Sequence, residues 1–100
     1  MELDAELTGA VVLYTGWGQK PYPAREGDRI IEAFGHDRGL DLIPKVHRLE
    51  DDFFESDARF TTDDLAEMGK KAAYDFRKAH PEIGGAAVEA LAWCYTFDFK

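Results

Sequence analysis

Apolar residues recur at helical spacing along most of this sequence, and this periodicity constrains the fold more than any other feature. The widest stripe steps by four, three and four residues through Leu42, Val46, Leu49 and Phe53. Residues three or four apart share one face of an α-helix, so an amphipathic helix is predicted from about residue 40 to residue 54. Pro44 fits only in the first turn of such a helix, which places the predicted start near Leu42 or Ile43.

Two helices are predicted before this one. The first has a stripe formed by Leu3, Leu7, Val11 and Tyr14. Gly16 is suited to close it in a left-handed conformation. Two glycines and two prolines in residues 16–23 predict a loop, and a short helix from about residue 24 to residue 34 should end at Gly35.

Two more helices are predicted after it. Thr61 or Thr62 should cap a helix that ends at His80-Pro81, with a buried stripe formed by Leu65, Met68, Ala72, Phe76 and Ala79. The last helix should begin at Pro81 or just after the Gly84-Gly85 pair, and Glu89 is the only charge in residues 86–93. A helix that is apolar nearly all round is predicted to be the central one.

The predicted fold is therefore mainly α, a compact bundle of four to five helices that forms a single globular domain over residues 1–100. One alternative concerns the chain ends. The run from Val11 to Thr15 is β-prone, and from Tyr95 to Phe99 aromatic residues alternate with polar ones. Either run suits a strand, so a short two-stranded pairing between them stays open.

Composition narrows the class of protein. The lone Cys94 cannot form an internal disulfide, and the acidic N-terminus does not resemble a secretory signal, so a cytoplasmic protein is expected. The longest apolar run is too short for a membrane span. A net charge of −8 argues against nucleic-acid binding. No cofactor is expected.

Enzymatic activity is not favoured either. Cys94 lies in the apolar last helix, where burial makes a thiol inert, and Ser56 is the only serine and lies among carboxylates. Gly16 and Gly18 lack the third glycine of a phosphate-binding loop.

Most of the negative charge lies in one segment. Residues 50–67, the acidic window, carry one base, Arg59, and eight acids: Glu50, Asp51, Asp52, Glu55, Asp57, Asp63, Asp64 and Glu67. The window thus holds −7 of the net charge of −8. Charge this localised predicts a docking surface for a basic protein.

The two halves of the window differ in their relation to the helix dipole. Asp63, Asp64 and Glu67 lie at a predicted helix start, where carboxylates are stabilised. Glu50, Asp51, Asp52 and Glu55 crowd a predicted helix end, where cations are preferred. Either these side chains form a solvated face with Arg48 and Arg59 as local counterions, or a cationic partner relieves the repulsion on binding.

Two other sites are considered. His47, Asp51 and Glu55 follow at intervals of four residues, which suggests a metal or small-ligand site on one helix edge. No second element supplies a matching ligand pattern. Trp17 and Tyr22 lie in the glycine- and proline-rich loop and are candidates to anchor a partner, the alternative being that Trp17 packs back against Trp93 or Tyr95.

The function predicted from the sequence is a non-enzymatic, acidic protein-interaction domain of the inhibitor, immunity or adaptor type. Its partner would be a basic protein surface, bound by Trp17, Tyr22 and the window residues from Glu50 to Asp64. The alternative is the metal or small-ligand site. The apolar C-terminal aromatics suit a homodimer as well as a monomer core.

Overall fold

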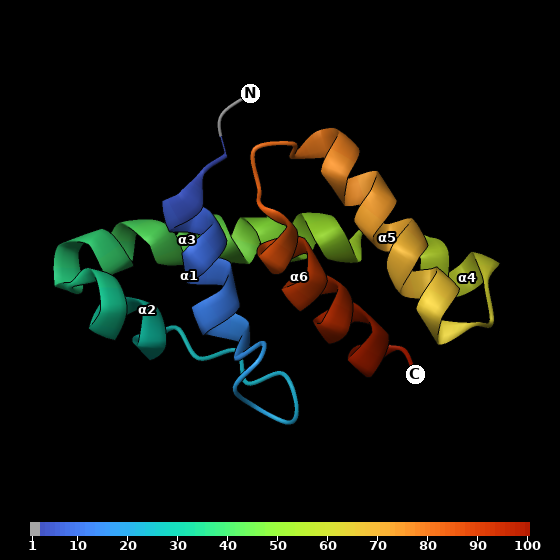
Figure 1. Ribbon diagram of the computed structural model, residues 1–100, viewed down its shortest axis with the longest axis horizontal. Coiled ribbons are helices and arrows are strands. Elements are labelled where there is room, and N and C mark those ends of the chain that lie inside the picture. The colour runs from blue at the N-terminus through green and yellow to red at the C-terminus, as the bar shows by residue number, and fades with distance from the viewer. Residues whose placement is uncertain (1–2) are drawn as a thin grey trace.

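A computed structural model describes residues 3–100, which form a mainly helical bundle (Figure 1). The elements follow in the order α1 (Ala5–Thr15), α2 (Asp28–Phe34), α3 (His36–Phe54), α4 (Ala58–Thr61), α5 (Leu65–Ala79) and α6 (Gly85–Asp98). The helices expected from the apolar stripes are present. The one-turn α4 has no counterpart among the predicted helices.

The helices form two layers. In Figure 1 the long α3 crosses behind α1, α6 and α5, and all three contact it. The molecule is 19 Å deep in this direction, which is about two helix diameters of 10–12 Å. α6 packs between α1 and α5 and also contacts α3, which confirms the prediction that the apolar last helix is central.

α1 begins and ends as its residue types require. The side chain of Asp4 accepts a hydrogen bond from the backbone N–H of Leu7 at 2.9 Å. Gly16 closes the helix at φ +81°, a left-handed conformation that favours glycine. The loop that follows returns along the helix, because the N–H groups of Ala24 and Glu26 donate to carbonyls at the end of α1.

The strand pairing of the chain ends is wrong, because residues 11–15 lie in α1, residues 95–98 lie in α6, and no strand occurs in residues 3–100. Tyr95 and Phe99 stand four residues apart and therefore also meet on a helix, with ring centroids 4.9 Å apart. The alternation that suggested a strand is compatible with a helix whose aromatic pair packs along one face.

Two predicted helix starts are also wrong. α3 begins at His36, so Pro44 lies inside the helix, in its third turn. Both Pro44 and Leu40 are exposed, so the carbonyl that loses its partner faces water. α5 is capped by Asp64, whose carboxylate accepts from the N–H groups of Ala66 at 2.8 Å and Glu67 at 3.2 Å. Thr61 instead ends α4.

The core is formed by apolar residues of all six helices. The radius of gyration is 13.1 Å, and about 13 Å is expected of a compact chain of this length. None of the helices within residues 3–100 combines the length and the apolar content needed to cross a membrane.

Candidate functional site

The acidic window covers the end of α3, all of α4 and the start of α5, at one end of the molecule in Figure 1. Its carboxylates differ in what surrounds them. Several form hydrogen bonds or ion pairs with groups of the same chain, and these carboxylates are therefore less available to a binding partner.

Glu50 is the most strongly engaged of these acids. It accepts hydrogen bonds from the Tyr14 hydroxyl at 3.1 Å and from Arg25 Nε at 2.7 Å, and its side chain is only 15% exposed. Burial opposes the charge of Arg25, but the hydrogen bond with Glu50 and the nearby Asp98 carboxylate outweigh burial and raise the pKa of the guanidinium. Glu50 therefore holds the loop against α3.

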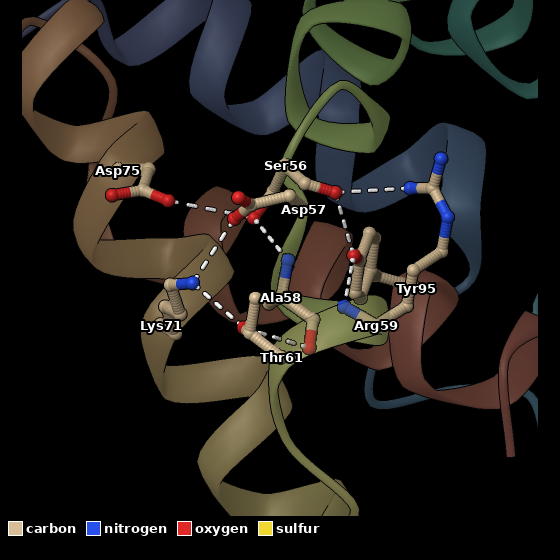
Figure 2. A network of polar contacts seen from close by, with 8 residues as sticks. All are labelled: Ser56, Asp57, Ala58, Arg59, Thr61, Lys71, Asp75 and Tyr95. Atoms are coloured by element: carbon tan, nitrogen blue, oxygen red, sulfur yellow. Dashed lines mark hydrogen bonds and ion pairs between the residues drawn. The ribbon is translucent and has the colours of Figure 1, made fainter.

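The carboxyl end of α3 has its own cation. Figure 2 shows Arg59 reaching back from α4, and its Nη1 donates to the carbonyls of Phe54 and Ser56, each at 2.9 Å. A cation at this position stabilises the helix dipole. Arg59 thus relieves part of the repulsion that the acids at this helix end create.

The buried Tyr95 fixes the turn between α3 and α4. Its hydroxyl donates to the carbonyl of Ser56 at 2.8 Å and accepts from the backbone N–H of Arg59 at 3.0 Å (Figure 2). The aromatic alternation at the chain end did not reveal this role, since the two contacts exist only once α6 lies beside the turn.

Four further acids have partners. Asp52 lies 2.9 Å from His80 Nε2, Asp57 forms an ion pair with Lys71 at 3.0 Å (Figure 2), and Glu67 lies 3.5 Å from Lys70. Asp64 caps α5. Of the carboxylates in the acidic window, those of Asp51, Glu55 and Asp63 are exposed and have no such partner among residues 3–100.

Part of the window surrounds a cavity. A recess of about 360 Å³ lies between the end of α3 and α5, and we call it the acidic recess. Three of its carboxylates come from the predicted window, Asp52, Glu55 and Asp57, and a fourth, Asp75, comes from α5. Asp75 was not among the predicted site residues, and its carboxylate accepts a hydrogen bond from the Ser56 hydroxyl at 3.4 Å (Figure 2).

The structure does not support the metal site proposed for His47, Asp51 and Glu55. In the described part of the chain no three side chains of His, Cys, Asp or Glu come together in a way that could hold a metal ion. The imidazole of His47 instead meets the ring of Tyr14 edge-on, with centroids 5.5 Å apart. A spacing of four residues aligns side chains along a helix without making them converge on one point.

The two aromatic residues of the loop, Trp17 and Tyr22, differ in their exposure. Tyr22 is 57% exposed, whereas Trp17 is half-buried and packs against Trp93, with ring centroids 5.2 Å apart. This packing confirms the alternative that Trp17 folds back onto the core.

The two tryptophans border a second and larger hollow. An open groove of about 750 Å³ runs between α5 and α6, and we call it the apolar groove. Its floor and walls include Leu65, Ala73, Val88, Ala92 and Phe97, and its charged groups are Lys70, Arg77, Glu89 and Lys100. This site was not predicted, because its lining comes from two helices and a loop that are far apart in the sequence, and because Leu65 was expected to be buried but is exposed.

Cys94 is fully buried, as predicted. Burial raises the pKa of its thiol to about 12, so at neutral pH it remains protonated.

Comparison of the chain with protein-family models, with curated proteins and with solved structures found no match.

Proposed function

We propose that this chain is a non-enzymatic protein-interaction domain that presents a carboxylate-rich surface to a basic partner, with the acidic recess at its centre. The observation that carries the proposal is the gathering of four carboxylates from α3, α5 and the intervening turn around one cavity. Carboxylates from separate elements create a local field that attracts cationic side chains.

An arginine or lysine side chain of the partner is the group that this recess suits. Glu55 and Asp75 lack basic partners within the described residues, while Asp52 faces His80 and Asp57 faces Lys71. Glu55 and Asp75 are therefore the carboxylates available to an incoming cation, and an arginine fork would bind them through charge-assisted hydrogen bonds.

The exposed carboxylates Asp51 and Asp63 have a secondary role in this proposal. Exposed charges change the rate of encounter and the salt dependence of binding more than the final affinity. We assign Asp51 and Asp63 to this long-range attraction. Glu50 and Asp64 are excluded from partner binding, because they serve the loop contact and the cap of α5.

The test is a calorimetric titration with a hexa-arginine peptide at low and at physiological ionic strength. Glu55→Gln/Asp75→Asn should weaken binding at least about thirtyfold, since each of the two lost charge-assisted bonds costs roughly 1 kcal/mol or more. Glu32→Gln/Asp37→Asn makes the same charge change at exposed sites away from the recess and should leave the affinity within about twofold at physiological salt, where distant exposed charges are screened.

Two results would overturn the proposal. One is absence of saturable binding by the peptide. The other is an equal loss of affinity in both double variants, which would mean that only the net charge of the protein attracts the peptide.

A further inference from the structure

The apolar groove carries a charge opposite to that of the whole chain. Three cations and one carboxylate line it, Lys70, Arg77 and Lys100 against Glu89, which gives +2 in a protein with a net charge of −8. Most of the remaining lining is apolar. An apolar trough with cations along it is complementary to an amphipathic anion.

These three cations are not held by strong ion pairs within the protein. Lys70 has a side chain 75% exposed and lies 3.5 Å from the exposed Glu67, a pair of a kind that contributes little to stability. Lys100 lies over the ring of Phe97 at 4.2 Å, and the exposed Arg77 makes no ion pair or hydrogen bond with any side chain of residues 3–100. All three can meet a ligand without breaking the core.

The shape of the groove follows from small residues where α5 and α6 meet. A Cβ atom added at Gly69 would lie 3.1 Å from Thr96 Cγ2, so the helices approach closely there, and the small side chains of Ala73 and Ala92 also line the groove. Trp17 and Trp93 also line the groove. The volume of about 750 Å³ falls in the range of about 300–1,000 Å³ typical of small-molecule sites.

The length of the groove suits an extended chain. Leu65 and Arg77 both line it, and a helical rise of 1.5 Å per residue places them about 18 Å apart along α5. Because α6 runs antiparallel to α5 (Figure 1), Lys100 lies near the Leu65 end and Arg77 near the other. A cation is thus present at each end of the apolar floor.

We propose that the apolar groove binds a long-chain carboxylate. The alkyl chain lies on the floor beside Trp17 and Trp93, and the carboxylate forms an ion pair with a lysine or arginine of the rim. A second copy of this chain is a poorer occupant, because a symmetric contact would bring the same cations face to face. The proposal is independent of the acidic recess, which none of these residues lines.

The two tryptophans allow a direct test, because Trp17 and Trp93 are the only ones in the chain and both line the groove. Dodecanoate, titrated below its micelle concentration, should give a saturable change in tryptophan fluorescence. Dodecyltrimethylammonium has the same tail and a cationic head, and should bind at least about tenfold more weakly because the rim repels it. Equal affinities for the two, or no saturation with dodecanoate, would overturn the proposal.

Charge-reversal variants locate the binding site. Lys70→Glu/Lys100→Glu should weaken dodecanoate binding about tenfold, because an attraction becomes a repulsion at each position. Lys45→Glu/Lys78→Glu changes the net charge equally at exposed positions outside the groove, and should alter the affinity by less than about twofold at physiological salt. An equal loss in both variants would show that binding does not involve the groove.

An acidic amphipathic helix is the competing occupant. A synthetic helical peptide with leucine on one face and glutamate on the other serves as the probe. Saturable binding of this peptide without binding of dodecanoate would overturn the assignment to a long-chain carboxylate.

Discussion

Arg25 shows how a single residue changes the interpretation of the acidic window. Its guanidinium forms ion pairs with Glu50 and Asp98, each at 2.7 Å, and lies 5.8 Å from the centre of the Phe54 ring. It does so from a left-handed backbone at φ +54°. Nothing in the local sequence links Arg25 to Glu50, so the sequence analysis counted Glu50 among the partner-binding acids.

Replacement of Arg25 by alanine should destabilise the protein. Arg25→Ala leaves the mostly buried Glu50 carboxylate without its cation, and a charged group that loses its partner costs about 1–3 kcal/mol. The free energy of unfolding is measured by urea denaturation. Arg38→Ala, which removes exposed ion pairs with Glu6 and Asp41, should cost much less, because exposed ion pairs contribute little to stability. A loss for Arg25→Ala as small as that for Arg38→Ala would contradict this role of Arg25.

Two buried ionisable groups predict a loss of stability at high pH. Burial raises the pKa of the Cys94 thiol from 9.0 to about 12. Burial and the nearby Glu50 carboxylate raise the pKa of the Tyr14 hydroxyl from 10.0 to about 12. The unfolded chain therefore releases these protons at lower pH than the folded chain. Stability from this source is complete below about pH 9 and is lost as the pH rises toward about 12.

The measurement is the free energy of unfolding in urea across this pH range. In Cys94→Ala the decline should begin nearer pH 10, the ordinary value for tyrosine, instead of pH 9. The comparison uses the slope against pH, so a change in overall stability does not affect it. A slope between pH 9 and pH 10 that is the same in both proteins would contradict the burial of the thiol.

At the scale of elements, apolar stripes predicted the helices well and their ends less well. α3 and α5 each carry a regular stripe that predicted the helix, and all four members of the α3 stripe are buried. In the α5 stripe only Met68, Ala72 and Phe76 are buried, whereas its two end members, Leu65 and Ala79, were predicted to be buried and are exposed. The start of α3 was missed because the missing hydrogen bond at Pro44 falls on the exposed side of the helix. Sequence alone does not show which side of a helix will face water at a given turn.

The contact between α2 and α3 depends on a glycine. A Cβ atom added at Gly39 would lie 2.8 Å from the backbone Cα of Ile31, and the backbone cannot move aside without shifting a helix. Gly39→Ala should therefore destabilise the protein by about 1–3 kcal/mol, the usual cost of overpacking, despite the better helix propensity of alanine.

Gly85→Ala is the matched control. Gly85 is the first residue of α6, it is exposed, and no atom lies within 4 Å of the added Cβ. The substitution should be neutral or stabilising by up to about 1 kcal/mol, because alanine has less freedom than glycine in the unfolded chain. Thermal unfolding of both variants tests the contact, and a stabilised Gly39→Ala would show that α2 and α3 do not approach closely.

At the scale of the whole molecule, the helical fold was predictable and the hollows were not. The excess of acids in residues 50–67 is visible in the sequence, but the acidic recess also needs Asp75, which only the packing of α5 on α3 brings there. The apolar groove needs α5, α6 and Trp17 together. Since it unites residues from distant parts of the chain, no local pattern reveals it.

The two hollows give the molecule two faces of opposite charge that share α5. Ala72, Asp75, Phe76 and Ala79 border the acidic recess, whereas Leu65, Gly69, Ala73 and Arg77 border the apolar groove. At 100° per residue these two sets lie on neighbouring faces of one helix. If both proposals hold, a basic peptide and a long-chain carboxylate can be bound at once.

Binding at the two faces should be independent at physiological salt. The Debye length there is about 8 Å, so charges on separate faces interact weakly. Saturating dodecanoate should therefore change the affinity for hexa-arginine by less than about twofold. In the same way, Glu55→Gln/Asp75→Asn should leave the dodecanoate affinity unchanged. At low salt the screening weakens, so a bound carboxylate should then strengthen binding of the peptide.

Competition between the two ligands would contradict this arrangement, because it would place them at one site. Calorimetric titration of hexa-arginine into the protein, with and without dodecanoate, distinguishes the cases. Lys45→Glu/Lys78→Glu serves as the control, since it alters net charge without touching either hollow. In this variant and in the unchanged protein, dodecanoate should leave the hexa-arginine affinity unaltered at physiological salt and change it only at low salt. That is the result expected of two separate sites on one small helical domain.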